Sequence, residues 1–444
     1  MAALHPAAID QKQELMIGNG YCIWFEFSPE SLDHITVSGN KMLSELNYNL
    51  WALWCIVSAG LIFNMKPFSR NRIYESRSRE YNIDGLRYVL AAMVAFQHKA
   101  FFFNLYKTGI WSLDYHIPFY IGKFAVSIFF IISGYILGNV SLHGKEWGGF
   151  YIKRFLRIAP MTYVSSLACI LISTCIGIYL KNPADFHLVF FWFDAGLTLI
   201  RPPVYGFDNA HLINAGVTWS LMWEWWFYFS LPILSIPFLK TRKLQVFALV
   251  LVALATIYAV ALHFGLENGP HAYNRYSVLG PVYVTLFCLG CIIRQVKERY
   301  LKTISIPRKM TDCLSLALLF VFLVIGYTHD PLTIPFAFAY GLFFLCFACG
   351  ANWFGLLQQK GVILLGDASY SIYLLHGIGW FLMDMFCFHF KINQNIYLYY
   401  TFMTLGWYMI CYISIKTFET VEIPFIRLGS RITRNMNLAP ERHS

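Results

Sequence analysis

The chain has 444 residues, of which 57% are apolar and 13% are charged, and its formal net charge is +10. Its apolar runs are repeatedly close to the roughly 20 residues that one bilayer crossing needs. This composition excludes an ordinary soluble domain and predicts an all-α, polytopic bundle of transmembrane helices. The alternating segments of a β-barrel are absent from the sequence. No soluble domain combines the cations with base-stacking aromatic residues, so we expect no nucleic-acid partner.

Eleven apolar segments are predicted to be membrane-spanning helices. The first, 48–65, either crosses the membrane or lies flat at its surface, so the prediction is ten core helices plus an extra N-terminal helix. The run 188–200 has only 13 residues and is predicted to be re-entrant or interfacial. The predicted spans are 48–65, 88–106, 121–139, 158–180, 217–239, 244–264, 277–294, 312–327, 334–350, 370–388 and 396–418.

Lysine and arginine divide unevenly between the two sets of connecting segments. One set carries 24 of these residues and the other carries 8. Since Lys and Arg accumulate on the cytoplasmic side of membrane helices, the sequence predicts a multi-pass protein of the cell (inner) membrane with a cytoplasmic C-terminus. The expected organisation is an extracytoplasmic tail (1–47), an extra helix with a basic cytoplasmic linker (48–79), a membrane domain (80–430) and a cytoplasmic tail (431–444).

The stretch RYVLAAMVAFQH (87–98) places two ionisable groups on one helix face. Eleven residues turn through about 1100°, roughly 20° beyond three full turns, so Arg87 and His98 point the same way. His98 then lies about 16 Å deeper than Arg87, near the middle of the bilayer. An ionisable group at that depth is rare and indicates function. The alternative is a histidine that only joins two helices through a hydrogen bond.

Lys99 and Glu224 are two further charges inside predicted spans. A charged Lys at mid-bilayer costs about 2.5–3.5 kcal/mol on insertion scales, so Lys99 needs a partner. Glu224 lies among aromatic residues, about 24 Å from the cytoplasmic face. The two groups are candidates for a buried ion pair; otherwise Lys99 faces a water-filled cavity, and Glu224 orients a hydroxyl or a histidine.

The stretch GGFYIKRFLRIAP (148–160) places Arg154 and Arg157 at i and i+3, on one helix face. Guanidinium groups bind phosphate through two parallel hydrogen bonds. These residues, with Lys153, therefore either hold a phosphorylated donor or mark the cytoplasmic end of a membrane helix.

Small and sulfur-containing residues give fewer indications of function. Ser133 either belongs to a site or bonds to the backbone of its own helix, and Gly134 and Gly138 beside it form a GxxxG helix-packing pattern. Most of the eleven cysteines lie in apolar runs, without CxxC or Cys/His spacing. We therefore expect neither a metal site nor a disulfide framework.

In this order, the motifs resemble the membrane acyltransferase family 3, from about residue 80 to 430. The resemblance rests on Arg87 and His98 after IDGLR (83–87), on Ser133–Gly134–Tyr135 in place of Ser-Gly-Phe, on Arg154 and Arg157 before Pro160, on TWSLMWEWWFY (218–228) with Trp225 in place of a second acid, and on GDASYSIYLLHG (366–377) followed by FETVEIPF (418–425).

The resemblance implies an O-acyltransferase that moves an acyl group, usually acetyl, from cytoplasmic acyl-CoA to a hydroxyl of a sugar, glycan or similar acceptor. It implies a central pair, a supporting acid and donor-side residues. Acyl-CoA, expected as acetyl-CoA, is then a substrate, and no permanently bound cofactor is expected. The implied site residues are His98 and Arg87 (central pair), Glu224 (acid), and Arg154, Arg157, Lys153 and Ser133 (donor side).

Two chemical routes and two competing classes stay open at this point. His98 either takes the proton of the acceptor hydroxyl or is itself acylated first. The competing class is a transporter or flippase that uses the buried charges as a substrate or proton path. The membrane-bound O-acyltransferases are a second enzymatic alternative, but the ordered motifs do not suit that family.

Overall fold

The computed structural model describes residues 39–65, 79–113, 115–138, 140, 142, 146–234, 243–264, 272–301, 306–325 and 329–438. The predicted tail as far as residue 38, most of the basic linker (66–78) and the last six residues lie outside this described part. Within it the secondary structure is helical, apart from an isolated bridge between Val204 and Phe207. The all-α prediction is confirmed.

The long helices follow the predicted spans in chain order. They are α2 (Gly39–Ile62), α4 (Tyr81–Thr108), α5 (His116–Leu137), α6 (Glu146–Tyr179), α7 (Trp219–Leu234), α9 (Lys243–His263), α10 (Ala272–Val296), α11 (Arg308–Ile325), α12 (Ile334–Ala348), α14 (Ser369–His389) and α15 (Ile396–Thr417).

Among the described residues, five helices are long and apolar enough to cross a membrane by themselves. They are His116–Leu137, Glu146–Tyr179, Gln245–His263, Leu279–Leu301 and Ser369–His389. α4 is longer than most of these but carries Arg87, His98 and Lys99, which lower its hydropathy. The total of ten or eleven spans stays a prediction.

The structure differs from the sequence prediction most clearly at two helices. α6 begins at Glu146, about three turns before the predicted residue 158, and α16 (Ile423–Leu438) forms beyond the last predicted span and extends into the predicted tail (431–444). The two helices pack together, with Gly149 of α6 against Thr433 of α16. Both segments are amphipathic. Their charged residues led to the prediction that they connect helices, whereas their apolar faces pack against each other.

Shorter helical pieces complete the chain between the long helices. The predicted interfacial run contains η2 (Val189–Phe193), whose Trp192 is fully buried and donates to Pro202 O at 3.1 Å. The others are η3 (Asp208–Leu212), the π-helical turns η5 (Lys297–Leu301) and η8 (Phe418–Glu422), η6 (Leu356–Gln358), α13 (Lys360–Asp367) and η7 (Ile392–Gln394).

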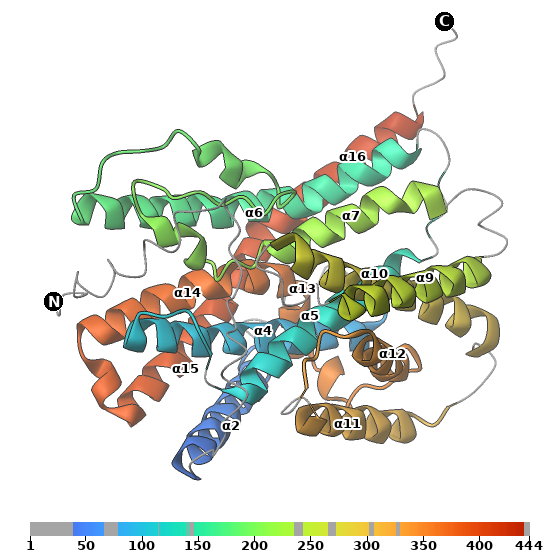
Figure 1. Cartoon of the computed structure of the whole chain (residues 1–444), viewed down its shortest axis with the longest axis horizontal. Helices are drawn as coiled ribbons and strands as arrows, with labels where there is room; N and C mark the ends of the chain where they lie inside the picture. Colours follow the sequence, from blue (N-terminus) through green and yellow to red (C-terminus); the bar gives the residue numbers. More distant parts are fainter. Residues whose placement is uncertain are drawn as a thin grey trace, which may run out of the picture.

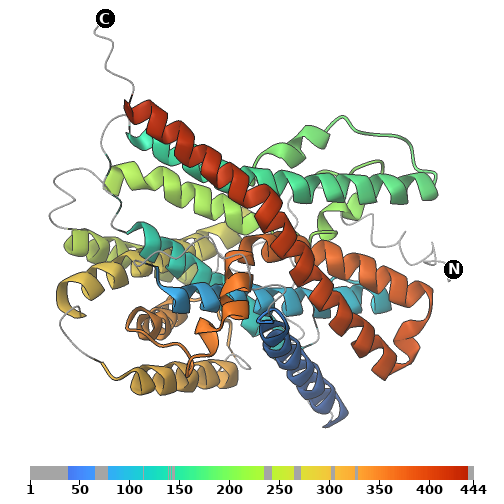
Figure 2. The same ribbon diagram turned by 180° about the vertical axis from the view of Figure 1, so that it is seen from behind.

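α4 lies at the centre of the bundle, and almost every residue of it from Asn82 to Asn104 is buried (Figures 1 and 2). α5 packs on one side of α4, and α13 and α14 pack on the other. α10 extends the packing from α5 to α9 and α12, while α15 lies beside α14. α6 and α16 lie side by side at another edge, next to α7 (Figure 1).

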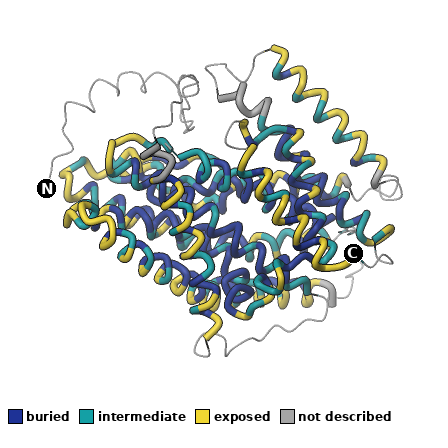
Figure 3. Tube along the Cα trace, turned by 90° about the horizontal axis from the view of Figure 1, so that it is seen from below, coloured by how far each residue is buried: buried dark blue, intermediate teal, exposed yellow. Residues whose placement is uncertain are grey.

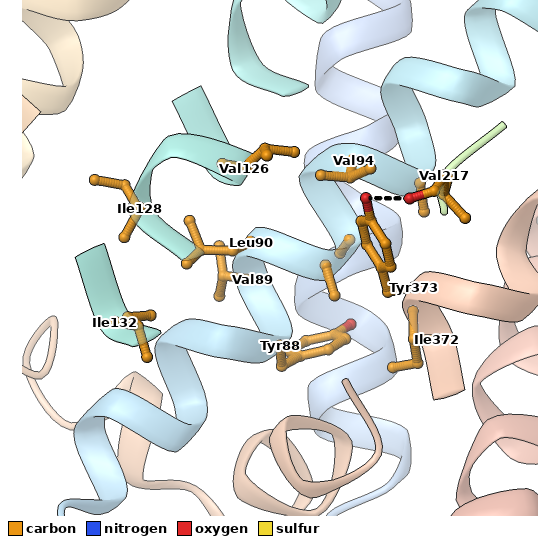
Figure 4. Close-up of a cluster of buried hydrophobic side chains, with 14 of the residues drawn as sticks. Tyr88, Val89, Leu90, Val94, Val126, Ile128, Ile132, Val217, Ile372 and Tyr373 are labelled. Atoms are coloured by element: carbon orange, nitrogen blue, oxygen red, sulfur yellow. Dashed lines mark hydrogen bonds between the residues drawn. The ribbon is translucent and has the colours of Figure 1, made fainter. Parts of the chain in front are cut away.

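An apolar cluster joins α4 to its neighbours. Leu90 and Val94 of α4 lie with Ile128 of α5 and Ile372 of α14 (Figure 4). In Figure 3 the buried residues, in dark blue, lie mostly in the interior of the bundle, and the exposed residues, in yellow, lie towards its outside. The outside is itself apolar in places: on α9, Leu249 is 71% exposed. Such a surface suits a lipid environment better than water.

The GxxxG pattern of α5 is a contact with α10. A Cβ atom added to Gly134 would lie 2.1 Å from the carbonyl oxygen of Phe287, and one added to Gly138 would lie 2.8 Å from Cα of Cys291. The two backbones therefore approach so closely that no side chain fits between them, as expected for small residues in membrane helices.

Replacing Gly134 by Ala should therefore destabilise the protein by about 1–3 kcal/mol, the usual cost of overpacking. Gly148→Ala is the matched control, because Gly148 is exposed and an added Cβ meets only Met436 Cε, at 3.9 Å. The thermal unfolding midpoint of the purified protein measures both changes. An unchanged midpoint for Gly134→Ala would show that the α5–α10 contact tolerates a side chain.

Candidate active site

α4 and α14 run side by side in the same direction and are joined by polar contacts at successive levels. Trp380 Nε1 donates to Ala95 O at 2.9 Å. His98 Nδ1 and His376 Nε2 are 2.9 Å apart. Further along, Lys99 Nζ lies 3.0 Å from Asp384 Oδ2. These contacts fix the register of the two helices, so the position of one histidine determines that of the other.

The two histidines form a directed hydrogen-bond chain. Nδ1 of His376 lies 3.1 Å from the carbonyl oxygen of Ile372, which only accepts, so this nitrogen carries a proton. In a neutral ring Nε2 of His376 then accepts, and the proton between the rings belongs to Nδ1 of His98. Nε2 of His98 is left with its lone pair, in the form of a base or nucleophile.

Burial and aromatic neighbours define the surroundings of this pair. His98 is 7% exposed and His376 is 0% exposed. The two rings stack with 5.1 Å between their centroids, and the Trp111 ring also stacks on His98, at 6.5 Å. Trp111 belongs to the segment that joins α4 to α5. The imidazoles are therefore held in a nearly water-free, aromatic environment.

Lys99 pairs with Asp384, so the sequence-based pairing with Glu224 is wrong. The ammonium group donates to both carboxylate oxygens of Asp384, at 3.0 and 3.1 Å, and to the Tyr399 hydroxyl at 2.6 Å. Tyr399 in turn donates to Asp384 at 2.6 Å. With 1% and 0% of their side chains exposed, Lys99 and Asp384 form a closed ion pair. Lys99 therefore does not face a cavity either.

Glu224 lies among the residues around the arginines instead. The hydroxyl of Tyr228, one turn along α7, donates to Glu224 Oε1. The Arg154 guanidinium lies over two rings that contact each other, 5.5 Å from the centroid of Tyr228 and 5.3 Å from that of Phe150. Because α6 starts earlier than predicted, Arg154 lies well inside the helix, where α7 can reach it.

Arg87 is in the second turn of α4, and Arg157 of α6 lies near it. We call this part of the bundle, where α4 begins, the arginine end. Arg87 interacts electrostatically with Arg157, with Asp84, which is 3.8 Å away, and with Asp367 and Glu422. Burial raises the pKa of the Asp367 carboxyl. The sequence-predicted residues Arg87, Arg154, Arg157 and Glu224 are thus brought into one neighbourhood from three helices.

α14 connects the arginine end to the histidine pair. Tyr370 interacts electrostatically with Glu224, Glu422 and Tyr228, and its hydroxyl contacts Thr162 at 2.9 Å. One turn further along, Tyr373 contacts Ser220 Oγ at 2.7 Å and donates to Val217 O (Figure 4). His376 follows after another turn, about 9 Å from Tyr370 along the helix axis.

Two predicted donor-side residues lie apart from this arrangement. Lys153 is exposed on α6, where its backbone faces Gly429 of α16. Ser133 is half-buried in α5, and in the described part of the chain no hydrogen bond joins it to the arginines. The structure therefore brings together four of the six charged or polar candidates other than His98.

The two departures from the family pattern have structural partners. The hydroxyl of Tyr135, which stands where Ser-Gly-Phe has its Phe, donates to Glu80 at 3.0 Å and accepts from Lys297 at 2.9 Å. Trp225, which replaces an acid, is buried and donates to Ala195 O at 2.9 Å. Both substitutions make contacts of their own and leave His98 untouched.

Sequence reasoning gave no role to three residues that the structure brings to this region. His376 and Glu422 lay in segments that were noted for their resemblance only. Asp384 lay inside a predicted span, and a lone carboxylate there could have been proposed as the partner of Lys99. The two spans have independent sequences, so only their packing revealed the pairing.

The comparison with protein families decides the class of this arrangement. A family model described as an acyltransferase domain matches residues 80–416. The chain belongs to this acyltransferase family. It is therefore an O-acyltransferase of a membrane, and its multi-pass helical architecture fits that class.

Two curated relatives are similar over most of this chain. Nodulation protein 10 of Rhizobium leguminosarum bv. viciae is 24% identical over 336 residues, which cover 69% of this chain and 86% of the relative. Peptidoglycan O-acetyltransferase OatA of Listeria monocytogenes serovar 1/2a is 25% identical over 328 residues, which cover 67% of this chain and 49% of the relative. The match thus spans about half the length of the second relative. No solved structure shows significant similarity.

The closed Lys99–Asp384 pair predicts a specific pattern of stabilities. Lys99→Met should lower the free energy of unfolding by about 3–5 kcal/mol, because it leaves a buried carboxylate without its counter-charge. Adding Asp384→Asn should recover part of this loss. Unfolding of the purified variants measures the double-mutant cycle.

Glu224→Gln combined with Lys99→Met is the control for this cycle. Since Glu224 does not contact Lys99, the two stability changes should simply add. Additive changes for Lys99→Met and Asp384→Asn would contradict the pairing seen in the structure.

Proposed function

We propose that the protein transfers an acetyl group from cytoplasmic acetyl-CoA to a hydroxyl of a sugar, glycan or similar acceptor. The observation that carries the proposal is the buried His98–His376 chain, which leaves a basic nitrogen on His98 near the centre of the bundle. Arg87, Arg154 and Arg157, at the arginine end, supply positive charge for the phosphates of the donor. The similarity to a peptidoglycan O-acetyltransferase supports both the acetyl group and a glycan hydroxyl.

In the direct route, His98 Nε2 takes the proton of the acceptor hydroxyl while the hydroxyl oxygen attacks the thioester carbonyl. The C–O bond forms, the C–S bond breaks, and the imidazolium returns the proton to the leaving thiolate. His376 holds the Nδ1–H of His98 and thereby fixes the tautomer. In the alternative route, His98 Nε2 carries the acetyl group first and then passes it to the acceptor.

The donor is expected to bind at the arginine end. Its phosphates cannot enter hydrocarbon, and guanidinium groups bind phosphate in two-point contacts. The excess of Lys and Arg in the connecting segments supports a cytoplasmic position for this end and for the C-terminus. Lys153 is exposed, and no hydrogen bond joins Ser133 to the arginines in the described part of the chain, so we assign neither a direct role.

A transporter or flippase is the competing proposal. Its strongest feature in the sequence was Lys99, whose ammonium group makes all its hydrogen bonds within the protein. Consumption of radiolabelled acetyl-CoA by the purified protein, with and without a glycan acceptor, distinguishes the two proposals. An enzyme releases free CoA, whereas a transporter leaves the thioester intact.

His98→Ala should reduce kcat by about 10²–10⁴-fold, the range of general acid–base catalysis, while the unfolding midpoint changes little. His376→Ala should lower kcat as well, because it frees the tautomer of His98. His376→Gln should keep more activity than His376→Ala, since its amide oxygen can still accept from Nδ1–H. Equal activity of wild type and His98→Ala would remove His98 from the mechanism.

Arg154→Gln and Arg157→Gln should raise KM for acetyl-CoA more than they lower kcat, since they act on the phosphates and not on the thioester. Added salt should raise KM in the wild type by screening the same charges. Lys replacements should restore binding only in part, because an ammonium cannot make the two-point contact. A double Gln variant with an unchanged donor titration would indicate that the arginines serve membrane topology alone.

A further inference from the structure

Glu422 combines deep burial with an unsatisfied hydrogen-bond acceptor. Its side chain is at the end of the π-helical turn η8, and the residue is 1% exposed. One carboxylate oxygen, Oε1, accepts from the Ser371 hydroxyl at 2.5 Å. The other, Oε2, has no hydrogen-bond partner among the described residues. A buried polar atom without a partner is expensive and calls for an explanation.

Protein groups near Glu422 do not remove this deficit. The backbone N–H of Ser371 faces the carboxylate, and Arg157 and Arg87 interact with it electrostatically. In the described part of the chain, no salt bridge joins Glu422 to either arginine. A π-helical turn is an uncommon backbone feature that often marks functional sites. The carboxylate is thus held in place, with one oxygen left over.

The position of Glu422 relates it to both parts of the candidate site. Its partner Ser371 is on the first turn of α14, five residues before His376, or about 7.5 Å along the helix axis. The Glu422 carboxylate also interacts electrostatically with Arg157 and Arg87 at the arginine end. A donor whose phosphates contact the arginines and whose thioester reaches His98 therefore passes Glu422 with its central portion.

The central portion of acyl-CoA is the pantetheine arm, which carries amide N–H groups and a hydroxyl. We propose that Oε2 of Glu422 accepts a hydrogen bond from an N–H or O–H group of this arm. Glu422 is then a donor-binding residue that recognises the arm, whereas the arginines recognise the phosphates. This inference rests on the proposed use of acyl-CoA as the donor.

The test compares two inhibitors of the full-length enzyme: CoA, and adenosine 3′-phosphate 5′-diphosphate, which keeps the nucleotide phosphates but lacks the arm. In Glu422→Gln an amide NH2 group, which only donates, can stand in place of Oε2, which only accepts, so the hydrogen bond from the arm is lost. The inhibition constant of CoA should then rise roughly 10- to 100-fold, as for a lost hydrogen bond to a charged group. The inhibition constant of the nucleotide should stay the same.

Glu419→Gln is the matched control, because Glu419 is on the same π-helical turn but pairs with the exposed Lys416. Both inhibition constants should be unchanged in it. If Glu422→Gln does not fold, Glu422→Asp withdraws the carboxylate by one methylene group and should also weaken CoA selectively.

Three results would overturn the inference. An equal rise for CoA and for the nucleotide would show that Glu422 acts only by holding the arginines. No change for either would show that it does not contact the donor. A wild-type enzyme that binds neither CoA nor acetyl-CoA would instead reject the proposed function, and this inference with it.

Discussion

The buried ion pair between Lys99 and Asp384 sets the constraint on which the arrangement of the site depends. With almost no exposed surface, the two charges have lost their hydration, and the contacts with each other, with Tyr399 and with the Phe103 ring compensate for it. Those contacts exist only when α4 and α14 are in one register. The same register stacks His98 on His376, so a stability requirement fixes the geometry of the histidine pair.

Close backbone contacts relate the arginine end to this pair of helices. A Cβ on Gly366 of α13 would lie 2.0 Å from the carbonyl oxygen of Asp84, so α13 touches the start of α4 directly. Asp367 is thereby brought to Arg79, its ion-pair partner, and α14 begins beside Arg87. The distance from the arginines to the histidines then follows from the length of α14 between them.

The site has a charged part and a neutral part that suit different portions of a large substrate. Arg87, Arg154 and Arg157 present cations where polar groups from several helices meet, whereas His98 is surrounded by aromatic rings. Low polarity around an imidazole strengthens its hydrogen bonds and excludes water. Of the residues that depart from the family pattern, Tyr135 bonds to Glu80 and Lys297, and Trp225 packs against Tyr228 with 5.8 Å between the ring centroids.

The sequence by itself determined the helical class, the order of the long helices and the alignment of Arg87 with His98. Each of these depends on the periodicity of a single segment, which local sequence encodes. It did not determine which helices meet. Lys99 binds Asp384 and not Glu224, His98 contacts His376, and Glu422 lies against Ser371, although the residues of each pair are far apart in the chain. Their contacts depend on how complete helices pack and on which buried charges find a partner, and only the tertiary structure decides that.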